Sequence, residues 1–119
     1  MIKGIGIDIV ELKRIEASMK KSDRFALRIL TKVEWQVYED LNAERRKVEY
    51  LAGRFAAKEA CSKAFGTGIG SKLSFQDIEI TTEKSGAPKL EVIGMKKSKL
   101  FVSISHSETY AVAQVIIEE

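Results

Sequence analysis

Two carboxylates and a lysine in this sequence could together act on a phosphate. Asp8 belongs to a run of alternating isoleucines and glycines, although aspartate is uncommon inside strands. Glu59 shares a helical face with apolar residues such as Ala52 and Phe55, and Lys63 follows one turn later. A carboxylate on an apolar face is unfavourable to bury unless it is paired or binds a metal. Mg²⁺ takes one or two protein oxygens together with phosphate and water, so Asp8 and Glu59 could hold it.

Simpler interpretations of the same residues stay open. The Asp8 carboxylate could cap the helix that follows its strand. Glu59 could form an ordinary surface ion pair with Lys63, since acidic and basic residues at this spacing often pair on helices.

A glycine-rich segment, GTGIG at residues 66–70, could bind an anion through converging backbone N–H groups. The segment lacks the Gly-Lys-Ser/Thr ending of a Walker loop, and it follows a helix instead of preceding one. A plain helix stop at Gly66 is an equally good interpretation.

The only histidine, His106, lies in SISHS at residues 103–107. Serine and histidine together suggest a nucleophile and its base, but the segment has no glycine elbow and no obvious acidic orienting residue. One histidine and one cysteine also cannot supply the usual zinc ligands. The sequence therefore argues against serine hydrolysis and zinc binding, and it favours a structural or ligand-contact role for His106.

A basic and apolar segment near the N-terminus could dock an acidic partner, with Met19 and Phe25 giving apolar contact. Its basic residues are Lys13, Arg14, Lys20, Lys21, Arg24 and Arg28. A solvated helical surface is the alternative, and a break predicted near Ser22 leaves a common face undecided.

These residues must be positioned by strands and helices. Alternation predicts a strand at residues 5–10, with its isoleucines on one face and its glycines and Asp8 on the other, where something can approach closely. Helices are predicted at 11–19, at 23–30 with Ser22 or Asp23 as N-cap, from the Thr31–Glu34 capping box through 41, and at 44–65. Gly66 ends the last of these.

The rest of the chain is predicted to be a loop at 67–74 and then two hairpins. The first pairs residues 75–82 with 89–93 around a turn at 85–88, and the second pairs 100–105 with 110–117. The fold class is therefore α+β, a mostly antiparallel sheet packed against one long helix and several short helices. No repeat or linker divides the chain, so residues 1–119 are expected to form one domain.

Composition sets the broad class. The chain has 45% hydrophobic and 31% charged residues, which excludes a disordered protein. No apolar run is long enough to span a bilayer, and the start lacks a signal-peptide pattern. Cys61 is the only cysteine, so no internal disulfide can form, and we expect a cytoplasmic protein. The net charge of +3 is compatible with several kinds of acidic partner.

Taken together, five segments resemble the small bacterial type of 4′-phosphopantetheinyl transferase, the holo-[acyl-carrier-protein] synthases. They are GIGIDIVE at residues 4–11, RFAAKEA at 54–60, SKA at 62–64, GTGIG at 66–70 and SISHS at 103–107. The resemblance covers nearly the whole chain, and the order and separation of the segments are specific.

The resemblance implies a Mg²⁺-dependent enzyme that moves the phosphopantetheine arm of coenzyme A onto a serine of an acyl carrier protein, in fatty acid biosynthesis. It implies catalytic roles for Asp8, Glu59 and Lys63, with Asp8 and Glu59 as metal ligands. The implied coenzyme A contacts are Arg54, Lys63, Gly66, Gly68 and His106. The implied carrier-protein contacts are Arg14, Met19, Arg24, Phe25 and Arg28.

The family is typically a homotrimer with active sites between subunits. An apolar last strand is compatible with this, because an uncovered edge is normally protected. That strand includes Val112, Val115, Ile116 and Ile117.

Two functions of other classes compete with this interpretation. A nucleic-acid-binding module would need stacking aromatics among its basic residues, but aromatics make up only 8% of the chain. A non-catalytic subunit that binds coenzyme A or a nucleotide would not need both Asp8 and Glu59. We therefore expect neither nucleic acid nor a membrane as a partner.

Overall fold

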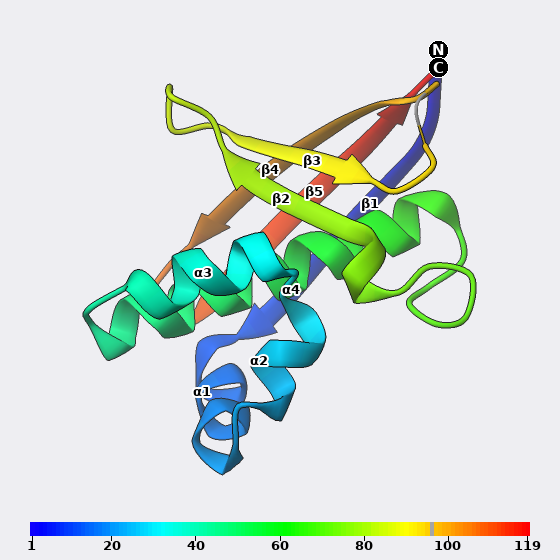
Figure 1. The fold of residues 1–119 in the computed structure, drawn as a ribbon. Coiled ribbons are helices and arrows are strands. Elements are labelled where there is room, and N and C mark those ends of the chain that lie inside the picture. Colours follow the sequence, from blue (N-terminus) through cyan, green and yellow to red (C-terminus); the bar gives the residue numbers. More distant parts are fainter. Residues whose placement is uncertain (96) are drawn as a thin grey trace.

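The structure is a computed structural model that describes residues 1–95 and 97–119. Its first half consists of one strand and four helices (Figure 1), namely β1 (Ile2–Glu11), α1 (Leu12–Lys21), α2 (Arg24–Ile29), α3 (Lys32–Asp40) and α4 (Glu44–Phe65). Its second half consists of a 3₁₀ turn and four strands, namely η1 (Phe75–Asp77), β2 (Ile78–Thr82), β3 (Pro88–Val92), β4 (Lys99–His106) and β5 (Tyr110–Glu118). None of the helices in the described residues has the length and hydropathy needed to cross a bilayer.

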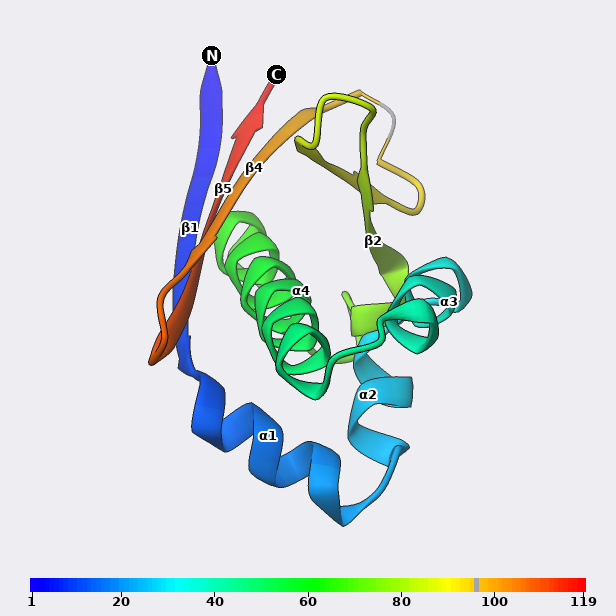
Figure 2. The ribbon, with the colours of Figure 1, turned by 90° about the vertical axis from the view of Figure 1, so that its left-hand side faces the viewer.

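The strands form two antiparallel sheets. β1, β5 and β4 make a three-stranded sheet in that order, and β2 and β3 make a separate hairpin. Figure 2 shows α4 in the middle of the molecule, with the three-stranded sheet on one side and α2, α3 and β2 on the other. This arrangement confirms the predicted α+β class with one long central helix and several short ones.

Local sequence signals explain the helix boundaries. The Thr31 hydroxyl accepts a hydrogen bond from the Glu34 backbone N–H, and the Glu34 carboxylate accepts one from Thr31, so the predicted capping box is confirmed. The long helix covers the predicted residues 44–65, and Gly66 ends it in the left-handed conformation with φ 78°.

The two largest boundary differences from the prediction are at the starts of β2 and β1. Residues 75–77, expected to begin a strand, form the 3₁₀ turn η1, in which the Asp77 carboxylate accepts a hydrogen bond from the Ser74 backbone at 2.9 Å. The strand β1 runs from Ile2 to Glu11, beyond the predicted 5–10, because β5 pairs with it over almost its full length.

The outer face of the three-stranded sheet is apolar and exposed. Ile5, Ile7 and Ile9 point outward and are 57%, 57% and 62% exposed. Figure 2 shows no described element over this face. β5 lies at the centre of the sheet, where it is hydrogen-bonded to β1 on one side and to β4 on the other. The expectation that this last strand is an uncovered edge strand is therefore wrong.

Candidate functional site

Two glycines of β1 bring the strand into direct contact with α4. A Cβ atom at Gly6 would lie 1.9 Å from the carbonyl oxygen of Ala60, and one at Gly4 would lie 2.0 Å from that of Ala64. Any larger residue would push the helix away from the strand. The close approach expected beside Asp8 is therefore made by the last turns of α4, and it places Asp8 beside them.

Lys63, on the last turn of α4, contacts Asp8. Its Nζ donates at 3.0 Å to Oδ1 of Asp8 and at 3.0 Å to the backbone carbonyl of Ile7. The Asp8 side chain is 16% exposed, and that of Lys63 is 52% exposed. The ordinary pair between Glu59 and Lys63, the alternative left open by the sequence, is wrong, because the lysine turns to the strand.

Glu59 lies within electrostatic range of the same groups. Burial raises the pKa of its carboxyl, and the negative charge of Asp8 raises it further. The positive charges of Lys63, Arg14 and Arg28 act in the opposite direction and lower this pKa. The two predicted metal ligands thus lie close enough to repel each other, with cations around them.

This donor set fits Mg²⁺. Two carboxylates from different elements lie within electrostatic range of each other, and Mg²⁺ commonly takes one or two such oxygens from a protein. Among the described residues, there is no group of three or more His, Cys, Asp or Glu side chains that could hold a metal.

The glycine-rich segment after α4 ends the helix. The backbone N–H of Gly66 bonds to the carbonyl of Lys63, and those of Thr67 and Gly68 both bond to the carbonyl of Ser62. Gly66 and Gly68 adopt positive φ angles of 78° and 68°. These hydrogen bonds support the helix-stop interpretation. Contact of this loop with coenzyme A stays a prediction.

His106 belongs to a second polar cluster at the other end of α4. Its Nε2 lies 3.6 Å from Oε2 of Glu49, and the same carboxylate oxygen accepts from Arg45 at 3.1 Å. Arg45 also donates at 2.8 Å to the backbone carbonyl of Glu108. A cavity of about 600 Å³ is lined by these residues and Ser107. Glu49 is the acidic neighbour of His106 that sequence reasoning missed, since 57 positions separate them.

Ser107, next to His106, has a structural role. Ser107 accepts hydrogen bonds from the backbone N–H groups of Thr109 and Tyr110, both at 3.1 Å, and thereby fixes the turn between β4 and β5. This local role agrees with the rejection of serine hydrolysis.

Arg54 lies between the two clusters. Its guanidinium lies over the Tyr50 ring at 4.2 Å, and it donates a long hydrogen bond of 3.4 Å to Thr82. Its Nε is buried without a hydrogen-bond partner among the described residues. A smaller cavity of about 170 Å³ is lined by Arg54 and His106. A buried donor without a partner beside a cavity is compatible with an anionic ligand.

The predicted carrier-protein contacts lie on α1 and α2. The two helices are separated at Ser22 and Asp23, as expected, and the Ser22 hydroxyl accepts from the Arg24 backbone N–H at 3.2 Å. The Phe25 ring packs on that of Phe55, with the centroids 5.8 Å apart. Arg14, Arg24 and Arg28 are exposed, and Met19 and Phe25 are partly buried.

The charges of Arg14 and Arg28 reach Glu59, because both lower its pKa. These two arginines of α1 and α2 therefore lie within electrostatic range of the candidate metal site.

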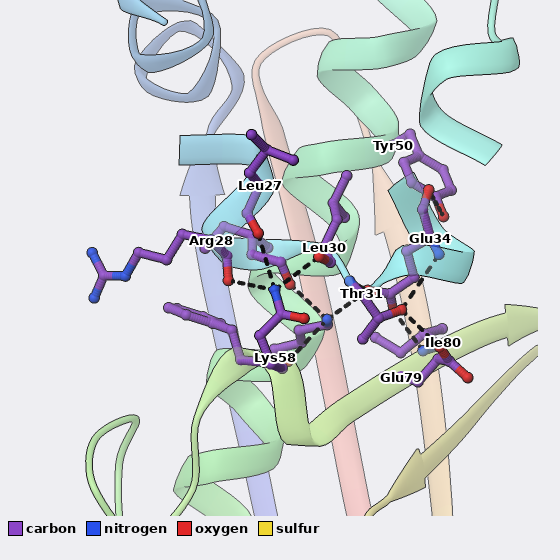
Figure 3. Close-up of polar contacts among 12 residues, drawn as sticks. Leu27, Arg28, Leu30, Thr31, Glu34, Tyr50, Lys58, Glu79 and Ile80 are labelled. Carbon is purple, nitrogen blue, oxygen red and sulfur yellow. Dashed lines mark hydrogen bonds and ion pairs between the residues drawn. The ribbon is translucent and has the colours of Figure 1, made fainter. Parts of the chain in front are cut away.

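A buried ion pair supports this region and was not predicted. Lys58 Nζ lies 2.6 Å from Glu34 Oε1, and neither side chain is exposed (Figure 3). Burial lowers the pKa of Lys58, and the Glu34 charge opposes this shift. Glu34 was identified only as a capping residue. The sequence signal for this ion pair was Lys58 itself, a lysine within the apolar, alanine-rich part of α4.

A larger cavity than these two lies elsewhere in the described part of the chain. It has a volume of about 700 Å³, between the β2–β3 hairpin and the start of β4, and it includes none of the predicted site residues. We assign the site from the juxtaposed charged groups, since a metal-phosphate centre depends on charge more than on enclosed volume.

The comparison with known families identifies the class of protein. The sequence pattern of the 4′-phosphopantetheinyl transferase superfamily matches residues 4–115. The chain belongs to this superfamily, with the carboxylates of β1 and α4 inside the matched region.

Comparisons with individual proteins are more specific. The holo-[acyl-carrier-protein] synthases of Oceanobacillus iheyensis and Bacillus subtilis are each 56% identical to this chain over 118 residues. These alignments cover 99% of this chain and 98% and 97% of the two relatives.

Solved structures agree with this relationship. A holo-(acyl-carrier-protein) synthase from Bacillus anthracis, in complex with coenzyme A (3′,5′-ADP), superposes with a TM-score of 0.91 at 50% identity, covering 100% of this chain and 98% of that one. The Helicobacter pylori synthase, in complex with coenzyme A, gives a TM-score of 0.85 at 39% identity, covering 96% and 99%.

Proposed function

We propose that this protein is a holo-[acyl-carrier-protein] synthase, which transfers 4′-phosphopantetheine from coenzyme A to a serine of apo-acyl carrier protein. The observation that carries the proposal is the junction of β1 and α4, where Asp8, Glu59 and Lys63 come together. Relatives with this name cover nearly the whole chain at 56% identity.

In the reaction, the serine hydroxyl oxygen forms a bond to the β-phosphorus of coenzyme A. The bond between that phosphorus and the bridging pyrophosphate oxygen breaks, and adenosine 3′,5′-bisphosphate leaves. Lys63 offsets the negative charge of the phosphates. Asp8 and Glu59 would hold Mg²⁺, which when bound supplies Lewis-acid stabilisation of charge on the phosphate oxygens.

The serine must lose its proton, and Glu59 is the base that we propose. A raised pKa makes a carboxylate a stronger proton acceptor, and burial together with the Asp8 charge raises the pKa of Glu59. The same carboxylate as a metal ligand would be a weaker base.

We further propose that the protein is a homotrimer with its sites between subunits, in the cytoplasm. Two features support a shared site. The first is the exposed apolar face, in which Ile5 is in register with Ile116 of β5 and then Phe101 of β4. The second is the separation of the polar clusters, since Glu49 and Glu59 lie about 15 Å apart along α4.

A long ligand could bridge the two clusters if a neighbouring subunit brought them together. The cluster of Arg54 and His106 would then contact the adenosine bisphosphate half of coenzyme A, while Lys63, Gly66 and Gly68 contact its pyrophosphate. The basic surface of α1 and α2 would hold the acyl carrier protein beside Glu59, and the electrostatic effect of Arg14 and Arg28 on Glu59 supports this placement.

The test is direct. The protein is incubated with coenzyme A, Mg²⁺ and apo-acyl carrier protein, and the carrier mass is measured by mass spectrometry. We expect the mass to increase by one phosphopantetheine, to stop increasing with a chelator, and to recover with added Mg²⁺. A carrier with its acceptor serine replaced by alanine is the control. Coenzyme A binding without any transfer would instead identify a non-catalytic coenzyme A-binding subunit.

A further inference from the structure

The short helix α2 ends without a local cap. It has only six residues, which is too short for a stable helix in isolation. Its C-cap residue, Leu30, is extended with φ −92° and ψ 135°, so the helix lacks the left-handed glycine that commonly ends helices. The last four carbonyl groups of a helix have no partner within it. The carbonyls of residues 27–30 must therefore find donors elsewhere.

Two side chains from outside α2 supply those donors. Gln76 Nε2 lies within hydrogen-bonding distance of three of the carbonyls, those of Leu27, Arg28 and Leu30, at 3.0, 3.1 and 2.8 Å, and its two hydrogens are shared among them. Lys58 Nζ donates at 2.7 Å to the fourth, that of Ile29. The hydrogen bonds to the carbonyls of Leu27, Arg28 and Leu30 are drawn as dashed lines in Figure 3. A cation at this end of a helix also complements the helix dipole.

One of the two donors belongs to α4, the helix that carries Glu59 and Lys63, and the other belongs to η1. Lys58 directly precedes Glu59 on α4, and its buried ammonium also bonds to Glu34 at 2.6 Å and to the Phe75 carbonyl at 3.1 Å. Gln76 follows Phe75 in η1, and the Phe75 ring lies under the guanidinium of Arg28 at 5.7 Å. The end of α2 is thus fixed to α4 and η1 by side chains only.

We propose that Gln76 is a positioning residue for carrier-protein docking. Together with Lys58, it holds α2 at a fixed orientation to α4, so that Arg24 and Arg28 face the partner at a set distance from Glu59. The inference rests on the proposed function, because it concerns how the carrier reaches that site. Gln76 itself touches neither the phosphates nor the metal ligands.

The variant Gln76→Met tests this role, because it keeps the size of the side chain and removes its donors. Gln76 is exposed, so the variant should fold. In the free protein, we expect the backbone amides of Leu27 and Leu30 to exchange about five- to tenfold faster. The KM for apo-acyl carrier protein should rise by about the same factor, while the KM for coenzyme A stays unchanged.

Two further variants sharpen the test. Gln36→Met makes the same chemical change on α3, where the amide donates to Asp40 on the same helix, and it should leave both exchange and kinetics unchanged. Gln76→Lys keeps donors at the helix end, so exchange in α2 should return towards the wild-type rate.

The outcomes separate this inference from the proposed function. Unchanged exchange in α2 would overturn the capping role of Gln76. Faster exchange with an unchanged carrier KM would overturn the link between this cap and docking. A wild-type protein that leaves the carrier unmodified would overturn the proposed function and, with it, the proposed role of Gln76 in carrier docking. The exchange rates would still test whether Gln76 caps α2.

Discussion

Lys63 donates a hydrogen bond to Asp8, with 3.0 Å between Nζ and Oδ1, although 55 positions separate the two residues in the sequence. The pair joins the first strand to the last turn of the longest helix, and Glu59 lies within electrostatic range of both. A phosphate that reached this junction would meet an ammonium and two carboxylates, and Mg²⁺ could join the carboxylates to the phosphate.

Loss of either carboxylate should stop the reaction. We expect Asp8→Ala and Glu59→Ala each to lower kcat/KM at least about 100-fold, because charge stabilisation of the transition state is lost. Glu83→Ala, in the exposed turn between β2 and β3, is the control. Carrier mass and melting temperature should be measured together. Normal turnover of a folded Asp8 or Glu59 variant at ordinary Mg²⁺ concentrations would rule out the shared metal site.

Lys63 should affect both coenzyme A binding and transfer. Lys63→Ala is expected to weaken coenzyme A binding about 10- to 100-fold, because a hydrogen bond to a charged group contributes roughly 1.5–3 kcal/mol. Lys63→Arg should rescue only partly, since a planar fork does not replace a compact ammonium. Calorimetric titration with coenzyme A measures the effect, and equal affinities of wild type and the alanine variant would contradict the role.

The outer face of the sheet should be a subunit interface. Ile5→Glu places a charge in the apolar row with Ile116 and Phe101, so the assembly is expected to dissociate and lose activity. Ile93→Glu is the matched control, because Ile93 is 75% exposed but lies outside this face. Light scattering gives the mass of each variant. A wild type that is fully active as a monomer would refute the trimer.

Charge reversal on α1 should affect the carrier more than coenzyme A. Arg14→Glu is expected to raise the KM for the carrier at least about tenfold. Salt should also weaken carrier binding to the wild type, because the Debye length falls from about 10 Å at 0.1 M to about 3 Å at 1 M. Lys84→Glu, on the distant β2–β3 turn, makes the same charge change. Steady-state kinetics at several salt concentrations decides the matter, and equal effects on both substrates would place Arg14 on an ordinary solvated surface.

Alkaline pH should destabilise the fold through buried acids. Burial raises the pKa of Cys61 to about 12 from an ordinary value of 9.0, and burial also raises the pKa values of Tyr38 and Tyr50 above 10.0. The unfolded chain therefore loses these protons first. The stabilisation is complete below the unfolded pKa and is lost as pH rises through the folded one.

The melting temperature should accordingly fall between about pH 9 and about pH 11, and less steeply for Cys61→Ala, which removes one of the three groups. The melting temperature of each protein is compared with its own value at neutral pH, because Cys61→Ala also removes packing contacts of a buried side chain. Parallel curves for the two proteins would show that the thiol does not contribute.

Much of the fold could be predicted because its signals are local. The 44–65 helix was predicted with both ends, since Gly66 provides the left-handed stop within the same segment. The alternation around Asp8 indicated which residues share its face. The prediction of a strand at residues 75–82 was wrong for its first three residues, where the hydrogen bond from the Ser74 backbone N–H to the Asp77 carboxylate favours a 3₁₀ turn.

The sequence by itself determined the elements, the faces of each element and the family, because backbone geometry fixes the spacing of side chains within one helix or strand. Only the tertiary structure decided which partner each charged group meets. Lys63 pairs with Asp8 instead of Glu59 because Gly4 and Gly6 let α4 pack directly on β1. Burial and electrostatic fields depend on every element around a group, and so the raised pKa of Glu59 arises only when the chain is folded.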